Sequence, residues 1–235
     1  GSLQLTAARS FVGNLTVAAG SVLGLTGALT SSAAAGTHVV SGDIIQNAAA
    51  LGNKLVFTGG GTLTGGTGNS NIVAVDFNTS GTYTVTAMKA LGANAATNAV
   101  EVLGGATVNL AMANLGTTAA PNWGDVTNLA VTNGRVNLTG NIDVANLDLT
   151  VAATGTLDFG DFNIWWKSAG TFTGVAASTY LATGATTGGY LQIRASSNIN
   201  TGGSLVPRII FDPEALGTFT LTLTGNTGVK DILTN

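Results

Sequence analysis

Residues 148–157 read DLTVAATGTL, and they closely repeat residues 14–23, which read NLTVAAGSVL. In both stretches polar residues alternate with Leu and Val until Ala-Ala and Gly interrupt the pattern. Alternation with a period of two places the apolar side chains on one face of a β-strand. Because such phrases recur in order along the chain, they predict the stacked coils of a β-solenoid, in which each coil buries the apolar edge of its neighbour.

The same alternation extends over much of the chain. It occurs at 81–86, 106–110, 128–132, 135–139 and 155–159, and in GTFTLTLTGNTG at 217–228. The threonines of the last run, Thr218, Thr220, Thr222 and Thr224, are predicted to be the outward half of a pleat. Asn133-Gly134 is a strong signal for a tight turn between two strands. We therefore expect a single all-β domain over 1–235, a β-solenoid of irregular coils; the alternative is a β-sandwich or jelly roll with an exchanged terminal strand.

Two stretches break the alternation. Residues 41–51, SGDIIQNAAAL, could form a short helix with Ser41 as its N-cap and Gly52 just past its end. Residues 86–91 could form one more helical turn. Helices this short need tertiary support, so both are expected to be a cap or a corner of the β structure.

The composition argues against several classes of function. Charged residues make up 8% of the 235 residues, against a usual share of about 25%, and the eight Lys and Arg residues are scattered singly. Nucleic-acid binding needs clustered cations, so we expect no such partner. The absence of cysteine removes disulfides and thiolate chemistry, and no apolar run approaches the roughly 18 residues of a membrane helix. An exterior this poor in charge is typical of an extracellular structural protein.

Motifs that could carry chemistry are each better explained by structure. Residues 65–73, GGTGNSNIV, follow the calcium-binding nonapeptide pattern, except that Ser70 stands where aspartate is needed. The carboxylates of Asp158 and Asp161 are predicted to bond backbone groups in a turn rather than to flank a glycosidase cleft. The single histidine, His38, lacks the neighbours of a triad or a metal centre. We therefore expect no enzyme activity, no metal and no cofactor.

Aromatic residues are the most conspicuous candidates for contacts with a partner. Trp165 and Trp166 are adjacent, so in a strand at most one of them can face the core. The other is expected in a subunit interface or, with Tyr180 and Tyr190, in a carbohydrate site. Glycosylation sequons occur at Asn14, Asn78 and Asn137.

Several phrases have the wording of a known class of protein. GTLDFG at 155–160, together with residues 168–174 and 179–184, resembles the repetitive extracellular surface proteins of bacteria with β-solenoid domains, of the autotransporter-passenger and filamentous-haemagglutinin kind. The resemblance covers about a third of the chain and lacks their regular coil length. It implies an adhesive or structural role outside the cell and carries over no functional residue.

The sequence therefore predicts an extracellular or cell-surface structural protein that assembles with copies of itself into a filament, sheath or surface layer. The predicted assembly contacts are the apolar residues of two terminal strands, Leu3, Leu5, Phe219, Leu221 and Leu223. Residues 1–12 are a possible assembly strand that adds to the edge of the next subunit. The alternative function is an adhesin or carbohydrate-binding module that uses the exposed Trp and Tyr residues. The chain opens on Gly1-Ser2, so we expect a removed leader or a remnant of cloning.

Overall fold

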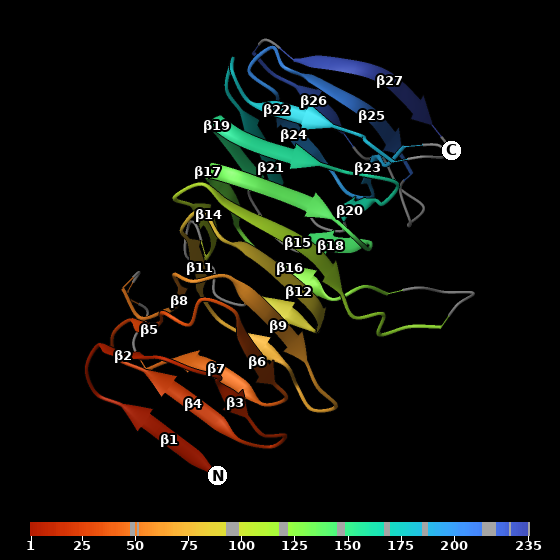
Figure 1. Ribbon diagram of the computed structural model, residues 1–235. Coiled ribbons are helices and arrows are strands. Elements are labelled where there is room, and N and C mark those ends of the chain that lie inside the picture. Colours follow the sequence, from red (N-terminus) through yellow and green to blue (C-terminus); the bar gives the residue numbers. More distant parts are fainter. Residues whose placement is uncertain are drawn as a thin grey trace.

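The protein is a parallel β-solenoid of about nine turns (Figure 1). The computed structural model describes residues 1–47, 50, 52–92, 99–117, 122–144, 149–166, 170–184, 188–212, 220–225 and 227–234. All strand pairings within these ranges are parallel, apart from an isolated antiparallel bridge between Asn114 and Trp123. The solenoid prediction is confirmed, and the sandwich alternative is wrong.

The strands form three rows along the stack, which we call the first, second and third faces. The first face is an eleven-stranded sheet of β1 (Ser2–Leu5), β4 (Val22–Leu25), β7 (Asp43–Gln46), β10 (Asn71–Ile72), β13 (Ala90–Leu91), β16 (Asp125–Val126), β18 (Ile142–Val144), β20 (Ile164–Trp166), β23 (Leu191–Ile193), β25 (Leu205–Phe211) and β27 (Gly228–Thr234). The chain visits the three faces in turn and then climbs to the next coil.

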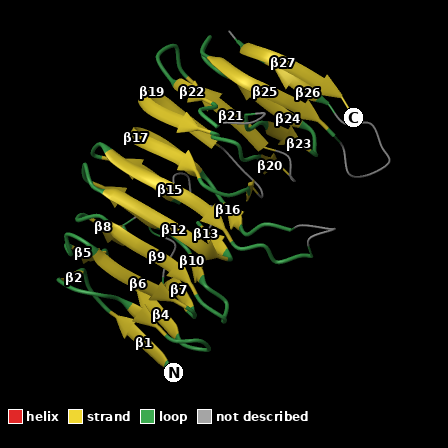
Figure 2. Ribbon diagram, turned by 45° about the vertical axis from the view of Figure 1, so that its right-hand side comes forward, coloured by secondary structure: helices red, strands yellow, loops and turns green. Residues whose placement is uncertain are grey.

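The second and third faces are joined into one sixteen-stranded sheet. The second face contains β2 (Arg9–Phe11), β5 (Leu29–Ser31), β8 (Leu55–Phe57), β11 (Val75–Asn78), β14 (Val100–Leu103), β21 (Gly170–Gly174), β24 (Ser197–Asn200) and β26 (Leu221–Leu223). The third face contains β3 (Thr16–Val17), β6 (Gly36–Val40), β9 (Gly61–Gly65), β12 (Thr82–Met88), β15 (Ala106–Met112) and β22 (Thr179–Leu181). Two long strands, β17 (Leu129–Leu138) and β19 (Leu149–Asp158), run through both faces and unite them (Figure 2).

The core is built from columns of apolar side chains that follow the stack. On the first face one column runs in register through the buried residues Leu23, Ile44, Ile72, Leu91 and Val126. Burying a side chain of this size contributes about 1.5–3 kcal/mol relative to leaving it exposed. The alternation in the sequence is therefore the alternation between these columns and the outer surface.

Coil length varies, as the sequence suggested. Ala90 pairs with Asp125, and Asp125 in turn pairs with Asp143, so a long coil is followed by a short one. The long coil carries the loop that the bridge between Asn114 and Trp123 closes, and the described arms of this loop, yellow-green in Figure 1, project from the side of the stack.

Both predicted helices are wrong where the structure describes them. Ile44 of the predicted helix 41–51 belongs to β7, while residues 48, 49 and 51 lie outside the described ranges. The predicted turn 86–91 is the end of β12 followed by β13, with a bend at Ala87, whose φ is +57°. Among the described residues of both stretches, Ile44, Met88 and Leu91 are buried in the core, and this packing overrides a weak helical propensity.

The tight turn predicted at Asn133-Gly134 is also wrong. Both residues lie inside β17, where the strand passes from the second face to the third without reversing direction. A Cβ atom at Gly134 would lie 2.5 Å from the carbonyl oxygen of Ala106, so glycine is needed there for close approach of the preceding coil. The signal marks a corner of the solenoid rather than a hairpin.

Candidate functional site

The N-terminal end of the apolar core is open. In the described part of the chain β1, β2 and β3 each pair on one side only, with β4, β5 and β6. Leu3 stacks on the buried Leu23 but is itself 59% exposed, because no described segment lies beneath it. A hollow of about 370 Å³ opens here, and its lining includes Leu3, Leu15, Val17 and Leu23. Leu5 is half-buried against the core.

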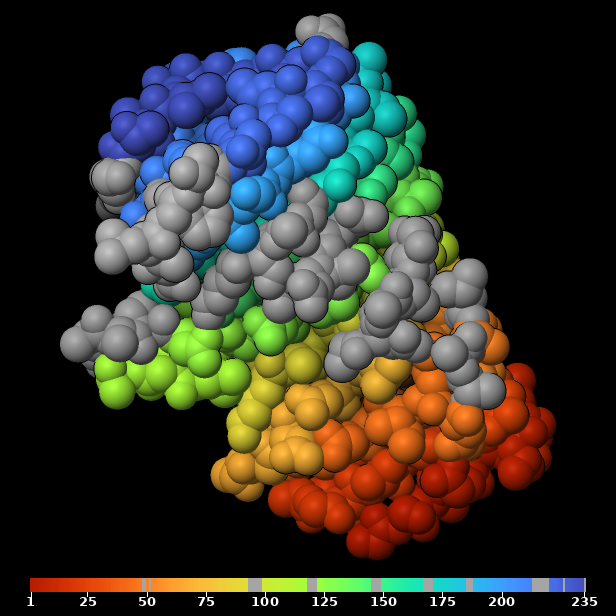
Figure 3. Space-filling view, turned by 180° about the vertical axis from the view of Figure 1, so that it is seen from behind, coloured from red at the N-terminus to blue at the C-terminus, as the bar shows by residue number. Residues whose placement is uncertain are grey.

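The C-terminal end repeats this arrangement at the opposite pole of the molecule (Figure 3). Leu223 of β26 stacks on the buried Ile199 and is 45% exposed. Ile232 of β27 stacks on the buried Ile209 and is 49% exposed. Leu221 packs partly against the core, and Phe219 lies outside the described residues. Four of the five predicted assembly contacts therefore lie on the terminal coils, two at each end.

An open edge of this kind can bind a further β-strand. Its strands present backbone N–H and C=O groups in the spacing that another strand needs. The exposed ends of the apolar columns lie beside those groups, so that an added strand would gain hydrogen bonds and burial together. Stacked-repeat proteins use a polar cap to prevent such additions.

The tryptophan pair divides between core and surface. Trp166 is fully buried and packs edge-on against Phe172, while Trp165 points outward, half-buried. The guanidinium of Arg194 lies 4.4 Å from the centre of the Trp165 ring, so a cation already covers one face of the indole. A sugar could therefore stack only on the opposite face.

The two tyrosines do not join Trp165 in a surface platform. Tyr180 is buried beside Phe172, at 5.4 Å between ring centres, and burial raises the pKa of its phenol to about 12. Tyr190 is half-buried in the segment that precedes β23. Tyr180 and Trp166 are thus core residues and are not available to a glycan.

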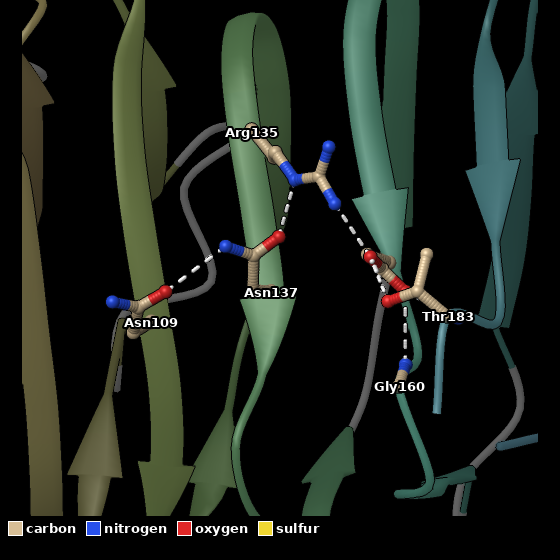
Figure 4. Close-up of polar contacts among 6 residues, drawn as sticks. Asn109, Arg135, Asn137, Gly160 and Thr183 are labelled. Atoms are coloured by element: carbon tan, nitrogen blue, oxygen red, sulfur yellow. Dashed lines mark hydrogen bonds and ion pairs between the residues drawn. The ribbon is translucent and has the colours of Figure 1, made fainter. Parts of the chain in front are cut away.

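A polar ladder that the sequence did not predict crosses the outside of the third face (Figure 4). The Asn137 amide donates to Asn109 Oδ1 at 2.9 Å, and the Arg135 side chain donates to Asn137 Oδ1. Arg135 also pairs with Asp158 at 2.5 Å. Thr183 Oγ1 donates to the same Asp158 oxygen at 2.7 Å. The ladder ties together four successive coils.

Asp158 is the anchor of this ladder. The carboxylate is 3% exposed and accepts the backbone N–H groups of Gly160, at 3.0 Å, and Thr183, at 3.2 Å. Burial alone would raise the pKa of the carboxyl, but these hydrogen bonds and the Arg135 guanidinium hold that pKa below its ordinary value. The prediction that Asp158 bonds backbone groups in a turn is confirmed. The carboxylate of Asp158 therefore has a structural role.

The remaining motifs have structural roles. Ser70 is buried with a φ of +53°, and its hydroxyl both donates to Gly66 O, at 3.0 Å, and accepts from Gly66 N, at 2.9 Å. It closes the glycine turn that the sequence interpretation favoured over calcium. Asn69 and Asn71 donate to Asp43. Among the described residues no group of three or more His, Cys, Asp or Glu side chains is arranged to hold a metal ion.

Two of the three sequon asparagines take part in hydrogen bonds between coils. Asn14 is exposed, and its Oδ1 accepts from Thr37 N at 2.8 Å. Asn137 is a member of the ladder, so a glycan on its amide nitrogen would break the bond to Asn109. Asn78 is half-buried at the end of β11.

Comparison of the chain with protein-family models, with curated proteins and with solved structures finds no match. No helix in the described part of the chain is long and apolar enough to cross a membrane. The geometry of the two ends therefore carries the functional argument.

Proposed function

We propose that the chain is an extracellular structural protein whose copies stack end to end into a filament, sheath or surface layer. The observation that supports this best is the pair of open core ends. Leu3 below, and Leu223 and Ile232 above, are 45–59% exposed although each continues a column of buried residues. A second copy placed on either end would bury them.

The strand direction makes the two ends complementary. Because every described coil runs in the same sense, the upper edge of one copy and the lower edge of another can pair as parallel strands and extend both sheets. A contact between two different surfaces does not close on itself unless the rotation forms a ring, so it produces an open polymer. The low share of charged residues, 8%, leaves little repulsion to oppose this association.

The test places a charge at each open end. Leu3→Lys and Ile232→Lys should keep the protein folded, because both positions are about half exposed, and should stop assembly, because stacking would bury an unpaired ammonium. Leu115→Lys is the matched control: Leu115 is 46% exposed but lies on the projecting loop, away from both ends. Negative-stain micrographs and sedimentation measure assembly, and circular dichroism checks the fold.

We expect fibres or sheets from the wild-type chain and from Leu115→Lys, and monomers from the two end variants. A wild-type protein that remains monomeric at high concentration would contradict the proposal, and so would end variants that assemble like the wild type. The location outside the cell is tested separately, by whether protease added to intact source cells removes the protein.

A further inference from the structure

The only histidine of the chain lies inside the solenoid near its N-terminal end. His38 is the central residue of β6 and is 1% exposed. Its ring sits between Phe11 of the first coil, at 6.2 Å between ring centres, and Phe57 of the third coil, at 4.7 Å. The histidine is therefore one member of an aromatic column that links the first coil to those above it.

The hydrogen bonding of the ring identifies its tautomer. The backbone N–H of Leu15 donates to His38 Nδ1 at 3.1 Å, so Nδ1 must be an acceptor and the proton lies on Nε2. Nε2 is buried and has no hydrogen-bond partner among the residues that the structure describes. A Cβ atom at Gly36 would lie 2.4 Å from Nε2, so the close approach of this nitrogen to the backbone depends on glycine at position 36.

Few other groups around the ring can titrate or carry charge. The described cavity walls next to His38 are formed by Phe57, Gly61, Thr62, Leu63, Phe77 and Tyr83. The Tyr83 phenol, on β12, donates to Phe57 O at 3.1 Å. Arg9, on the same strand as Phe11, is exposed and donates to Ala8 O. Burial lowers the pKa of His38 below its ordinary value.

The same histidine holds the end of the first coil. β3 has two residues, Thr16 and Val17, and pairs only with β6 in the described part of the chain. The preceding residues are held to β6 by the Leu15–His38 bond, by Leu15 O accepting from Val39 N at 2.9 Å, and by the Asn14 side chain accepting from Thr37 N. A protonated imidazole has a donor on both nitrogens, so the Leu15 N–H would face another donor.

We propose that His38 is an acid-sensitive clasp, whose protonation releases residues 14–17, and with them the first coil, while the later coils remain stacked. The closed state requires an acceptor at Nδ1 and an uncharged ring between two phenylalanines, and a proton removes both conditions. Terminal repeats of a stacked protein can open without global unfolding, because each repeat contacts only its neighbours.

The sign of the pH dependence follows from the direction of the His38 shift. The released coil binds a proton at the ordinary pKa of about 6.5, and the closed coil binds it only at lower pH. The clasp is therefore fully stable above about pH 6.5 and is lost as the pH falls through the closed-state value. Between these two values opening should increase about tenfold for each pH unit, because it takes up one proton.

The test is an NMR titration of the intact chain. With one histidine in the sequence, the imidazole signal belongs to His38. We expect its midpoint below 6.5. Over the same interval, amide protection at Leu15 and in β1, measured relative to an unstructured peptide at each pH, should fall, while protection of Val136 and Leu157 in the middle coils stays constant. A midpoint at or above 6.5, or unchanged protection at Leu15 through the midpoint, would overturn the proposal.

Two variants separate charge from packing. His38→Gln retains a side-chain acceptor but cannot be protonated, so the first coil should stay closed over this pH range. His38→Phe removes the acceptor, so Leu15 should be less protected at every pH, without a step. If His38→Gln still opens over the same interval, another group is responsible and the proposal fails. Should either variant not fold, the wild-type titration decides alone.

Discussion

Asp158 connects several coils through hydrogen bonds and an ion pair. Few of these contacts can be predicted from the sequence. A turn role could be predicted, because Gly160 follows two residues later. The partners Arg135 and Thr183 could not, because each lies more than twenty positions away and meets Asp158 only in the observed register. Register depends on irregular coil lengths, which alternation alone does not give.

Asp158→Asn should lower the free energy of unfolding by about 1.5–3 kcal/mol at pH 7, because Arg135 and two backbone N–H groups lose their charged acceptor. The folded pKa of Asp158 is lowered, so its stabilisation is present above about pH 3.8 and is lost as the pH falls through the folded value. Urea unfolding at pH 7 and at pH 3 should therefore show a difference between variant and wild type that shrinks in acid.

The matched control for this change is Asp231→Asn. Asp231 is also paired with an arginine, Arg208, but the distance is 3.8 Å and the Asp231 side chain is 44% exposed. An exposed ion pair contributes about 0–1 kcal/mol. Equal losses for the two substitutions would show that the ladder adds nothing to stability beyond an ordinary surface pair.

At the scale of the element, the alternation of apolar residues predicts strands well and corners poorly. In β26, Leu221 and Leu223 lie over Ser197 and Ile199, while Thr222 lies over the outward Asn198, as the threonine row predicted. The sequence predicts helices or tight turns at some corners, because the same glycine, asparagine and alanine residues occur in all three structures. A corner is distinguished by how closely its backbone approaches a neighbouring coil. A short segment of sequence carries no information on that distance.

The effect of replacing a corner glycine should therefore depend on how closely a neighbouring coil approaches it. Gly61→Ala should destabilise the protein strongly, since its φ is +126° and a Cβ there would lie 2.1 Å from Gly36 O in the coil below. Gly13→Ala has the same φ, +126°, but meets nothing within 4 Å. We expect a loss of about 1–3 kcal/mol for Gly13→Ala, from the backbone alone. Thermal unfolding should show a larger loss for Gly61→Ala, and equal losses would argue against close coil contact as the cause.

At the scale of the whole molecule, the recurrence of one sequence motif predicts that coils stack. It does not predict which face of the solenoid each copy of the motif occupies. Residues 14–17 lead into β3 on the third face, whereas 149–151 begin β19 on the second face. The two similar segments are therefore equivalent strand-and-corner units that occupy different faces of the solenoid. This explains why the fold was predictable from alternation and order, while the coil boundaries and the interior place of Tyr180 and His38 were not.

The two proposed ways in which the first residues could serve assembly predict different behaviour of a truncated chain. The strand predicted at 1–12 forms β1 and β2, two rungs of the first coil, so removing residues 1–20 takes away that coil and presents β4 and β5, with Leu23 in place of Leu3. If copies stack on an open core, this truncated chain should still form fibres. If the first strand is instead donated to a neighbour, the truncated chain should remain a folded monomer. Electron microscopy of the truncated and the full-length chains, with circular dichroism as the check on folding, distinguishes the two, because the second coil presents a new stacking surface once the first is removed, whereas a donated strand is lost.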